Sequence, residues 1–193
     1  MGYQKGLESR EAILDAAAAV VRRRGFEATS FADVCDAIGI SRGKLTHHFP
    51  TKEALFEAVL ESRFQRFRQR IVAPLLDTAR EPRARIVASL DELRAIYGEG
   101  STVPGCYIGH TAMDLATRTP AMQQQLDRLL DDWRAAFADA LIALGRPHPT
   151  ARGQAFLAVS AIQGAVLLAR AQPEKHALIE TLDELQRTLL ADT

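Results

Sequence analysis

Residues 25–55 read GFEATSFADVCDAIGISRGKLTHHFPTKEAL and decide the fold of the N-terminal part of the chain. Thr29 or Ser30 caps a short helix, and Asp33 follows three residues after Ser30 in an arrangement like a capping box, with Asp in place of Glu. Gly39 ends that helix, and Ser41 caps a second short one. Two short helices joined through a glycine-containing turn are typical of a helix-turn-helix.

The second short helix has an apolar side and a cationic side. Leu45 and Phe49 are expected to face the core, which leaves Arg42 and Lys44 facing outward. Gly43 lowers helix propensity by about 1 kcal/mol. It also removes a side chain where the tip of a helix would approach the major groove of DNA. The spacing predicts a DNA-reading helix, and the alternative is a charged, solvated helix of a bundle.

The rest of the 193-residue chain reads as helix, because apolar residues recur at intervals of three and four. We expect an all-α protein with a three-helix helix-turn-helix domain at 1–50 and a larger helical effector-binding and dimerisation domain at 51–193. The helices expected outside the two short ones are 9–24, 52–71, 81–97, 106–117, 120–144, 150–171 and 174–191. Pro74 is expected to lie just beyond the long fourth helix.

Composition limits the classes of partner. The formal net charge is zero, so attraction to nucleic acid has to come from a local patch. Two cysteines are too few for a disulfide framework. The N-terminus lacks an apolar signal core, and no apolar run approaches the ~18–20 residues that a membrane span needs. We therefore expect a cytoplasmic protein with no membrane partner.

The stretch from Gly25 to Leu60 resembles the N-terminal signature of the TetR family of bacterial transcriptional regulators. That signature reads G-(aromatic)-x-x-T-(S/T), then D-I-A-x-x-A-G-V-S-x-G-x-(hydrophobic)-Y-x-(Y/H)-F-x-x-K-x-x-L. The departure is Thr46, where the family commonly has a tyrosine that contacts DNA. By position in the motif, the resemblance implies this DNA-facing set: Thr29, Ser30, Ser41, Arg42, Gly43, Lys44, Thr46, His47 and Lys52.

The resemblance also implies a homodimer that binds a palindromic double-stranded DNA operator and is released by a small-molecule effector. Repression is the default of the family, and activation stays open. The last two long helices would form a four-helix dimer bundle. The apolar residues that could line its seam are Phe156, Val159, Ile162, Gly164, Val166, Leu167, Leu178, Ile179, Leu182, Leu185 and Leu189.

An effector pocket is expected among the middle helices, lined by apolar and aromatic residues with a few polar tips. The candidates are Phe64, Phe67, Leu90, Leu93, Tyr97, Cys106, Tyr107, His110, Met113, Trp133 and Phe137. The alternative for each of them is ordinary core packing.

Cys106 supports an alternative kind of signal. It follows Pro104 and Gly105 in the first turn of an expected helix, with His110 four residues later. The helix dipole and the histidine would both lower the pKa of the thiol and make it reactive. The alternative function is therefore a repressor that senses electrophiles or oxidants through Cys106, and the competing interpretation is a small buried residue.

Other classes of function lack the residues that they need. An enzyme on a helical bundle would need Glu-x-x-His pairs for a metal, or a nucleophile with its base, and neither pattern is evident. His110 and Asp114 have no further ligands, so no metal and no cofactor are expected. A protein-interaction module that uses the helix-turn-helix for partner contact is the remaining alternative. Steep salt dependence of binding would distinguish a DNA-binding protein from it.

Overall fold

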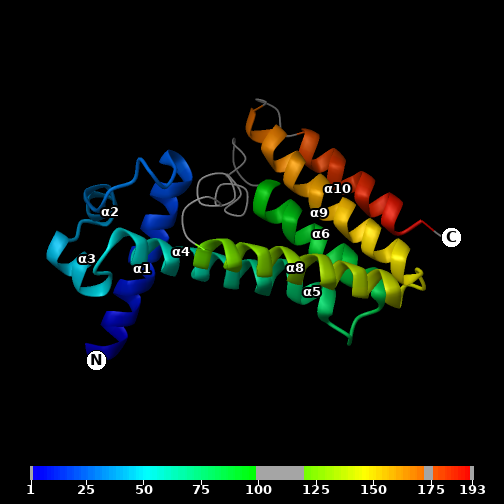
Figure 1. Cartoon of the computed structure of the whole chain (residues 1–193), viewed down its shortest axis with the longest axis horizontal. Helices are drawn as coiled ribbons and strands as arrows, with labels where there is room; N and C mark the ends of the chain where they lie inside the picture. The colour runs from blue at the N-terminus through cyan, green and yellow to red at the C-terminus, as the bar shows by residue number, and fades with distance from the viewer. Residues whose placement is uncertain (1, 99–119, 172–175, 192–193) are drawn as a thin grey trace.

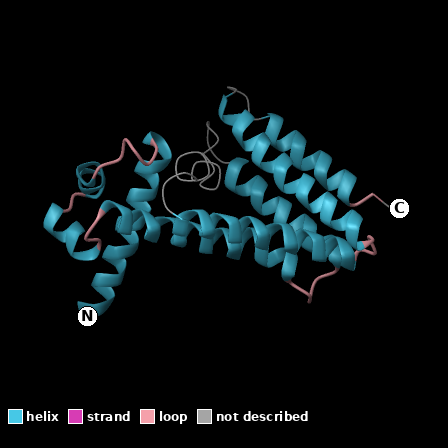
Figure 2. Ribbon diagram, in the orientation of Figure 1, coloured by secondary structure: helices cyan, strands magenta, loops and turns pink. Residues whose placement is uncertain are grey.

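The computed structural model describes residues 2–98, 120–171 and 176–191, and every regular element in these ranges is a helix (Figure 2). The elements are α1 (Gly2–Arg24), α2 (Phe31–Ile38), α3 (Arg42–His48), α4 (Lys52–Phe67), the π-helical segment η1 (Arg68–Val72), α5 (Ala73–Leu76), α6 (Pro82–Gly98), α8 (Pro120–Ala143), α9 (His148–Ala171) and α10 (His176–Leu189). The prediction of an all-α fold is confirmed. The helix expected at 106–117 lies outside the described residues.

The helices form a small N-terminal group and a larger bundle, and α4 runs from one into the other (Figure 1). The buried residues form two clusters. The smaller cluster unites α1, α2 and α3 around Ile13, Val34 and Leu45. The larger one is built from α4, η1, α5, α6, α8, α9 and α10, and it also includes Val21 of α1 and Phe26. In the larger group, α9 packs between α8 and α10, while α6 contacts both α8 and α10.

Helix α4 supplies both clusters. Leu55 and Val59 are buried with α1, α2 and α3. Phe56, Leu60 and Phe64 are buried with the larger bundle. The two sets occupy different sides of one helix, because residues three or four apart share a face. The N-terminal group is therefore attached to the bundle by a packed helix.

The end of α4 differs from the prediction. We expected the helix to end near Ile71 with Pro74 beyond it, but the helical path continues through η1 and α5 to Leu76. Proline cannot donate the backbone hydrogen bond that an α-helical turn would require of it. In the wider turn of η1, the N–H of Ala73 donates to the carbonyl of Arg68, five residues earlier. The π-helical turn lets the chain pass Pro74 without a break. At the other end of the chain, α1 begins at Gly2 rather than near Ser9.

Helix α9 contains a long apolar stretch. Among the described residues, His148–Ala169 is the one helical stretch that is long and apolar enough to cross a membrane, with a mean hydropathy of 1.3. The sequence analysis expected no such run, because polar residues such as Arg152, Gln154 and Gln163 interrupt it. Length and composition are weak evidence for a span, because the core helix of a folded domain passes the same test. Helix α9 does pack between α8 and α10.

Candidate nucleic-acid interface

Local capping features fix both ends of α2. The backbone N–H of Ser30 donates to Oδ2 of Asp33 at 2.8 Å, and the N–H of Asp33 donates back to Oγ of Ser30 at 3.3 Å. This completes the predicted capping box. At the other end of α2, Gly39 has a φ of 68°, in the left-handed region that favours glycine. The chain therefore reverses within three residues and starts α3.

Helix α3 presents one face to the protein and the other to solvent. Leu45 is 0% exposed and Phe49 is also buried. Arg10 of α1 lies over the ring of Phe49, with its Cζ 5.2 Å from the ring centroid. On the opposite side the exposed residues are Ser41, Arg42, Gly43, Lys44 and His47. The sequence predicted this division of the helix correctly.

The surroundings of Gly43 show that the fold itself does not require a glycine there. The helix is right-handed at this position, since Gly43 is not among the described glycines with positive φ. A Cβ added at Gly43 would have Ser41 Oγ as its nearest neighbour, at 4.0 Å. Alanine would therefore fit within the chain and favour the helix. A requirement for glycine here would have to come from a molecule outside the chain.

Thr29 does not belong to the outward-facing set. It is 1% exposed, and its hydroxyl donates to the carbonyl oxygen of Gly25 at 2.8 Å. Its side chain closes the turn between α1 and α2 and cannot reach a ligand at the surface. The motif position was correctly recognised, but the sequence pattern did not show that the hydroxyl is used internally. Ser30 beside it is exposed, although its hydroxyl donates to Asp33 Oδ2 at 2.7 Å.

Two further residues of the expected set make internal contacts. The hydroxyl of Thr46 lies 3.1 Å from the carbonyl oxygens of both Arg42 and Gly43, so it donates to its own helix. Lys52 Nζ donates to the carbonyl of Glu27 at 3.2 Å and lies 4.7 Å from the ring centroid of Phe26. An ammonium group has three donors. Lys52 therefore stabilises the start of α4 and keeps donors for a second partner.

Ion pairs connect the N-terminal helices to one another and to α4. Arg24, the last residue of α1, pairs with Asp33 of α2. The hydrogen bonds from Ser30 and then the charge of Arg24 hold the pKa of Asp33 below its ordinary value. Asp15 of α1 pairs with Arg63 and Arg66 of α4. Partial burial raises the pKa of Asp15, but the two arginines more than offset this effect, so its pKa is lowered.

A short exposed cationic helix with a glycine at its tip, held by a second helix across a tight turn, has the geometry of a helix-turn-helix that enters the major groove. The fold and this surface define a DNA-binding transcriptional regulator of the helix-turn-helix class. Residues 13–59 match the family description "Bacterial regulatory proteins, tetR family", and residues 82–184 match "Transcriptional regulator LmrA/YxaF-like, C-terminal domain". The chain belongs to the TetR family.

Known relatives and solved structures agree with this assignment. An HTH-type transcriptional regulator of Mycobacterium tuberculosis is 28% identical over 190 residues, covering 95% of both chains. The HTH-type transcriptional repressor DhaR of a Mycobacterium species is 24% identical over 190 residues, covering 95% of this chain and 93% of DhaR. The crystal structure of a TetR transcriptional regulator from Chloroflexus aurantiacus is 28% identical and superposes with a TM-score of 0.83, covering 96% of each chain.

The expected effector-binding residues divide into two groups. Phe64, Leu93, Tyr97, Trp133 and Phe137, together with Leu90, are buried in the larger cluster, and Phe67 packs against it half-buried. The structure thus brings these residues into one core. Cys106, Tyr107, His110 and Met113 lie outside the described residues.

The outward face of α9 carries a surface that the sequence pattern resolved only in part. Its large apolar side chains are strongly exposed: Phe156 (54%), Leu157 (67%), Leu167 (57%) and Leu168 (51%). Small residues, Ser160 and Gly164, lie between them along the same face. We call these six residues the α9 face. Most of the other residues expected in a dimer seam are buried within the chain itself: Val159, Ile162, Val166, Leu178, Leu182 and Leu189.

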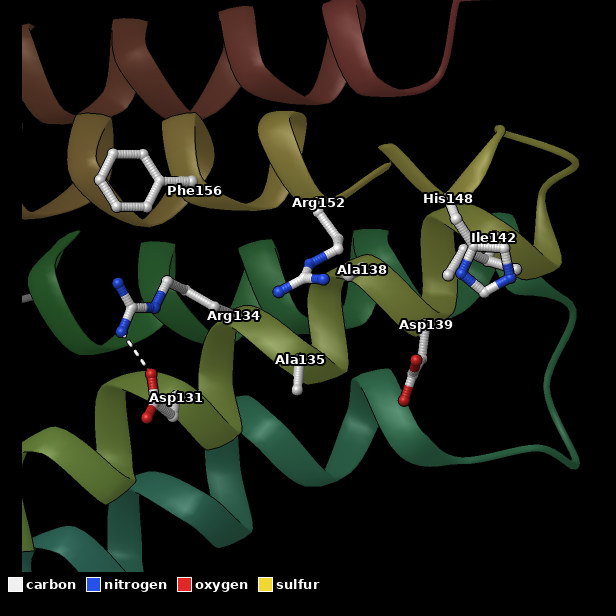
Figure 3. A pocket seen from close by; sticks show the side chains of 9 residues that line it. All are labelled: Asp131, Arg134, Ala135, Ala138, Asp139, Ile142, His148, Arg152 and Phe156. Atoms are coloured by element: carbon white, nitrogen blue, oxygen red, sulfur yellow. Dashed lines mark hydrogen bonds and ion pairs between the residues drawn. The ribbon is translucent and has the colours of Figure 1, made fainter. Parts of the chain in front are cut away.

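A groove of about 710 Å³ borders the α9 face on the side of α8. Figure 3 shows Arg152 and Phe156 of α9 and Arg134 and Asp139 of α8 around it. Arg134 pairs with Asp131 and also lies over Phe156, with its Cζ 5.7 Å from the ring centroid. A second groove, of about 690 Å³, borders the other side of α9, where Ala161 faces Glu180 and Glu184 of α10. The α9 face is therefore an apolar strip between two charged margins.

Proposed function

We propose that this protein is a ligand-responsive transcriptional repressor that binds a palindromic operator as a homodimer. Residues 1–50 form the DNA-binding domain, and residues 51–193 form the effector-binding and dimerisation domain. The observation that carries the proposal is Gly43, because the chain leaves open space at this position on an exposed cationic helix. A duplex that approaches the tip of α3 supplies a physical reason for the missing side chain.

The residues proposed to face DNA follow from the exposed side of α3 and its neighbours. Arg42 and Lys44 contact guanine O6 and N7 or the phosphates, and His47 contacts a phosphate. Ser30 and Ser41 are exposed at the N-termini of α2 and α3, where the helix dipole favours a phosphate. Lys52 directs a remaining donor to the backbone of the duplex. Thr46 offers its methyl group, because its hydroxyl is used within the helix.

The homodimer is proposed to form through the α9 face together with α10. A contiguous patch of several large, exposed apolar side chains usually marks an interaction site. A Cβ added at Gly164 would meet nothing within 4 Å, so the chain does not itself need a glycine there. A helix of a second copy would approach closely at Ser160 and Gly164, between the large side chains. The charged margins on α8 and α10 would then form the polar rim of the interface.

Effector binding in the larger core is proposed to displace α4. This would change the distance between the two DNA-binding domains of the dimer. The partners are therefore operator DNA, a small molecule and a second copy of the chain, in the cytoplasm. The alternative signal, oxidation or alkylation of Cys106, rests on the sequence around that residue. If Cys106 is the sensor, Cys106→Ser will bind DNA normally but fail to release it when treated with an electrophile. A normal release would leave Cys106 as a packing residue.

The DNA contact is tested by gel shift with the promoter next to the gene's own coding region. Arg42→Ala and Lys44→Ala are each expected to weaken binding by roughly 5- to 100-fold. The matched control is Arg80→Ala, which removes an exposed arginine paired with Asp77 in the loop before α6. Wild-type affinity should fall steeply with salt, because phosphate contacts release counterions. Unchanged affinity in both α3 variants, or binding that is insensitive to salt, would contradict the proposal.

A further inference from the structure

The indole N–H of Trp133 is a buried donor without an acceptor among the described residues. Trp133 is 0% exposed at the centre of α8. Its ring meets the edge of Phe67, with 4.8 Å between the centroids and an interplanar angle of 79°, and it lies 6.3 Å from the ring of Phe137. Buried tryptophan N–H groups usually have a partner. An unpartnered one reduces stability and is a feature that needs an explanation.

No described residue accepts a hydrogen bond from this N–H, although the side-chain oxygens of Gln125 and Gln154 are also buried without a partner. The fully buried polar residues among those described are Thr29 and Ser89. Thr29 donates to Gly25, and Ser89 donates to the carbonyl of Ile71 at 2.8 Å. An ordered water is a poor substitute, because a buried water needs two to four polar partners. The acceptor that satisfies Trp133 would therefore arrive with a bound molecule.

We propose that Trp133 is the hydrogen-bond donor of the effector site, and that the effector is an uncharged, ring-containing molecule with a carbonyl or similar acceptor. This inference rests on the proposed function and names the chemical class of its ligand. The aromatic neighbours Phe67 and Phe137 favour a flat apolar body. None of the described residues that are buried carries a charge, so a charged ligand would lose its hydration without compensation.

Trp133 is also placed to affect the helix that leads to DNA. Phe67, which its ring contacts, is the last residue of α4 and directly precedes η1. The next residue, Arg68, pairs with Asp132, the neighbour of Trp133 on α8, with 3.1 Å between Nε and Oδ2. Two successive residues of the α4–η1 junction therefore contact two successive residues of α8. A ligand that moves the indole would act directly on this junction.

The chain contains a single tryptophan, so its indole N–H gives one proton–nitrogen NMR signal that needs no assignment beyond its loss in Trp133→Phe. The wild-type protein is titrated with acetophenone, with α-methylstyrene, which replaces C=O by C=CH₂, and with benzoate, which has a similar shape and a negative charge. Acetophenone should move the indole proton downfield and bind roughly five- to tenfold more tightly than α-methylstyrene. Benzoate should bind at least tenfold more weakly than acetophenone.

In Trp133→Phe the two neutral probes should bind equally, while Phe137→Leu, a change in the same core that keeps the N–H, should retain the preference for the ketone. If Trp133→Phe does not fold, the three titrations of the wild-type protein are sufficient to test the inference. Equal affinity of the neutral probes in the wild type, no binding of acetophenone, or an indole proton already hydrogen-bonded without a probe would overturn the inference. Gel shift of the same protein without a probe tests DNA binding separately. If the protein binds DNA but shows no preference for the ketone, this inference is wrong and the proposed function stands. If the protein prefers the ketone but does not bind DNA, the proposed function is wrong.

Discussion

At Gly43 the stability of the chain and the proposed affinity for DNA make opposite demands. The exposed helix would gain from a methyl group, and nothing in the chain obstructs one. Gly43→Ala should therefore raise the free energy of unfolding by about 0.5–1 kcal/mol. The same substitution should weaken operator binding, because the methyl group occupies the space where the duplex approaches. Thermal unfolding and gel shift on one preparation measure the two effects, and a stabilised variant with unchanged DNA affinity would show that α3 does not approach DNA at this point.

The lowered pKa of Asp33 makes the stability of the N-terminal helices depend on pH. The pKa of its carboxyl is lowered in the folded chain, so it stabilises the fold above the unfolded value of about 3.8. That contribution is lost as the pH falls through the lower, folded pKa. Asp33→Asn should therefore be less stable than the wild type at neutral pH, and the difference should shrink below pH 3.8. Denaturant unfolding at a series of pH values measures this.

The control for this titration is Asp36→Asn, which neutralises an exposed carboxylate of the same helix, α2. Asp36 makes no hydrogen bond or ion pair recorded among the described residues. Its substitution should change stability little at any pH. If Asp33→Asn and Asp36→Asn behave alike, the capping box does not contribute measurably to the stability of α2.

Among the elements, η1 continues α4 inside the larger bundle, where it packs against α6 and α8. Arg70 pairs with Glu92 of α6 at 2.7 Å, Arg68 pairs with Asp132 of α8, and the buried Ser89 donates to the carbonyl of Ile71. The π-helical turn is thus held from two sides. A widened turn of this kind often lies at a functional position.

Ser89→Ala should destabilise the protein by about 1 kcal/mol, because it removes a buried hydrogen bond and leaves the Ile71 carbonyl with one partner fewer. Amide hydrogen exchange in residues 68–76 should become faster. Ser62→Ala, in α4, removes a half-buried hydroxyl that makes no hydrogen bond to the described residues, and it serves as the control. Equal stability of the two variants would mean that the hydroxyl of Ser89 does not hold η1.

The sequence predicted the elements whose signals are local and missed those that depend on tertiary contact. Ser30, Asp33 and Gly39 define α2 through bonds within a few residues, so the capping box and the turn were predictable. The burial of Thr29 and the contact of Lys52 with Glu27 arise from the packing of separate helices. The continuation of the helix past Pro74 depends on a change of hydrogen-bond register that no residue pattern announces. The unpartnered N–H of Trp133 likewise appears only when its neighbours are placed.

At the scale of the whole molecule, the exposed α9 face predicts that the protein dimerises. Leu157 is 67% exposed in the single chain, and burying a leucine on each side of a two-fold interface contributes about 3–6 kcal/mol. Leu157→Glu should therefore weaken dimerisation by roughly a hundredfold or more, and operator binding should fall with it. Sedimentation at a series of protein concentrations measures the dimer.

Leu76→Glu is the matched control, since Leu76 is 52% exposed on α5 and is not one of the six residues of the α9 face. It makes the same chemical change at a residue that the dimer is not proposed to bury. Dimerisation and DNA binding should persist in this variant. A wild-type protein that is monomeric at micromolar concentration, or a Leu157→Glu variant that dimerises normally, would contradict the assignment of the α9 face.

Because α4 is buried in both clusters, it limits where this protein can be joined to another regulator. In a chimera that takes residues 1–50 from this protein, the residues that replace Leu55 and Val59 would come from the other protein. A junction placed after Val59 would keep Leu55 and Val59 with the N-terminal helices, yet would still place Phe56 of this chain against the recipient's bundle. Specificity can therefore be transplanted between such proteins only where the recipient accepts both sides of this shared helix.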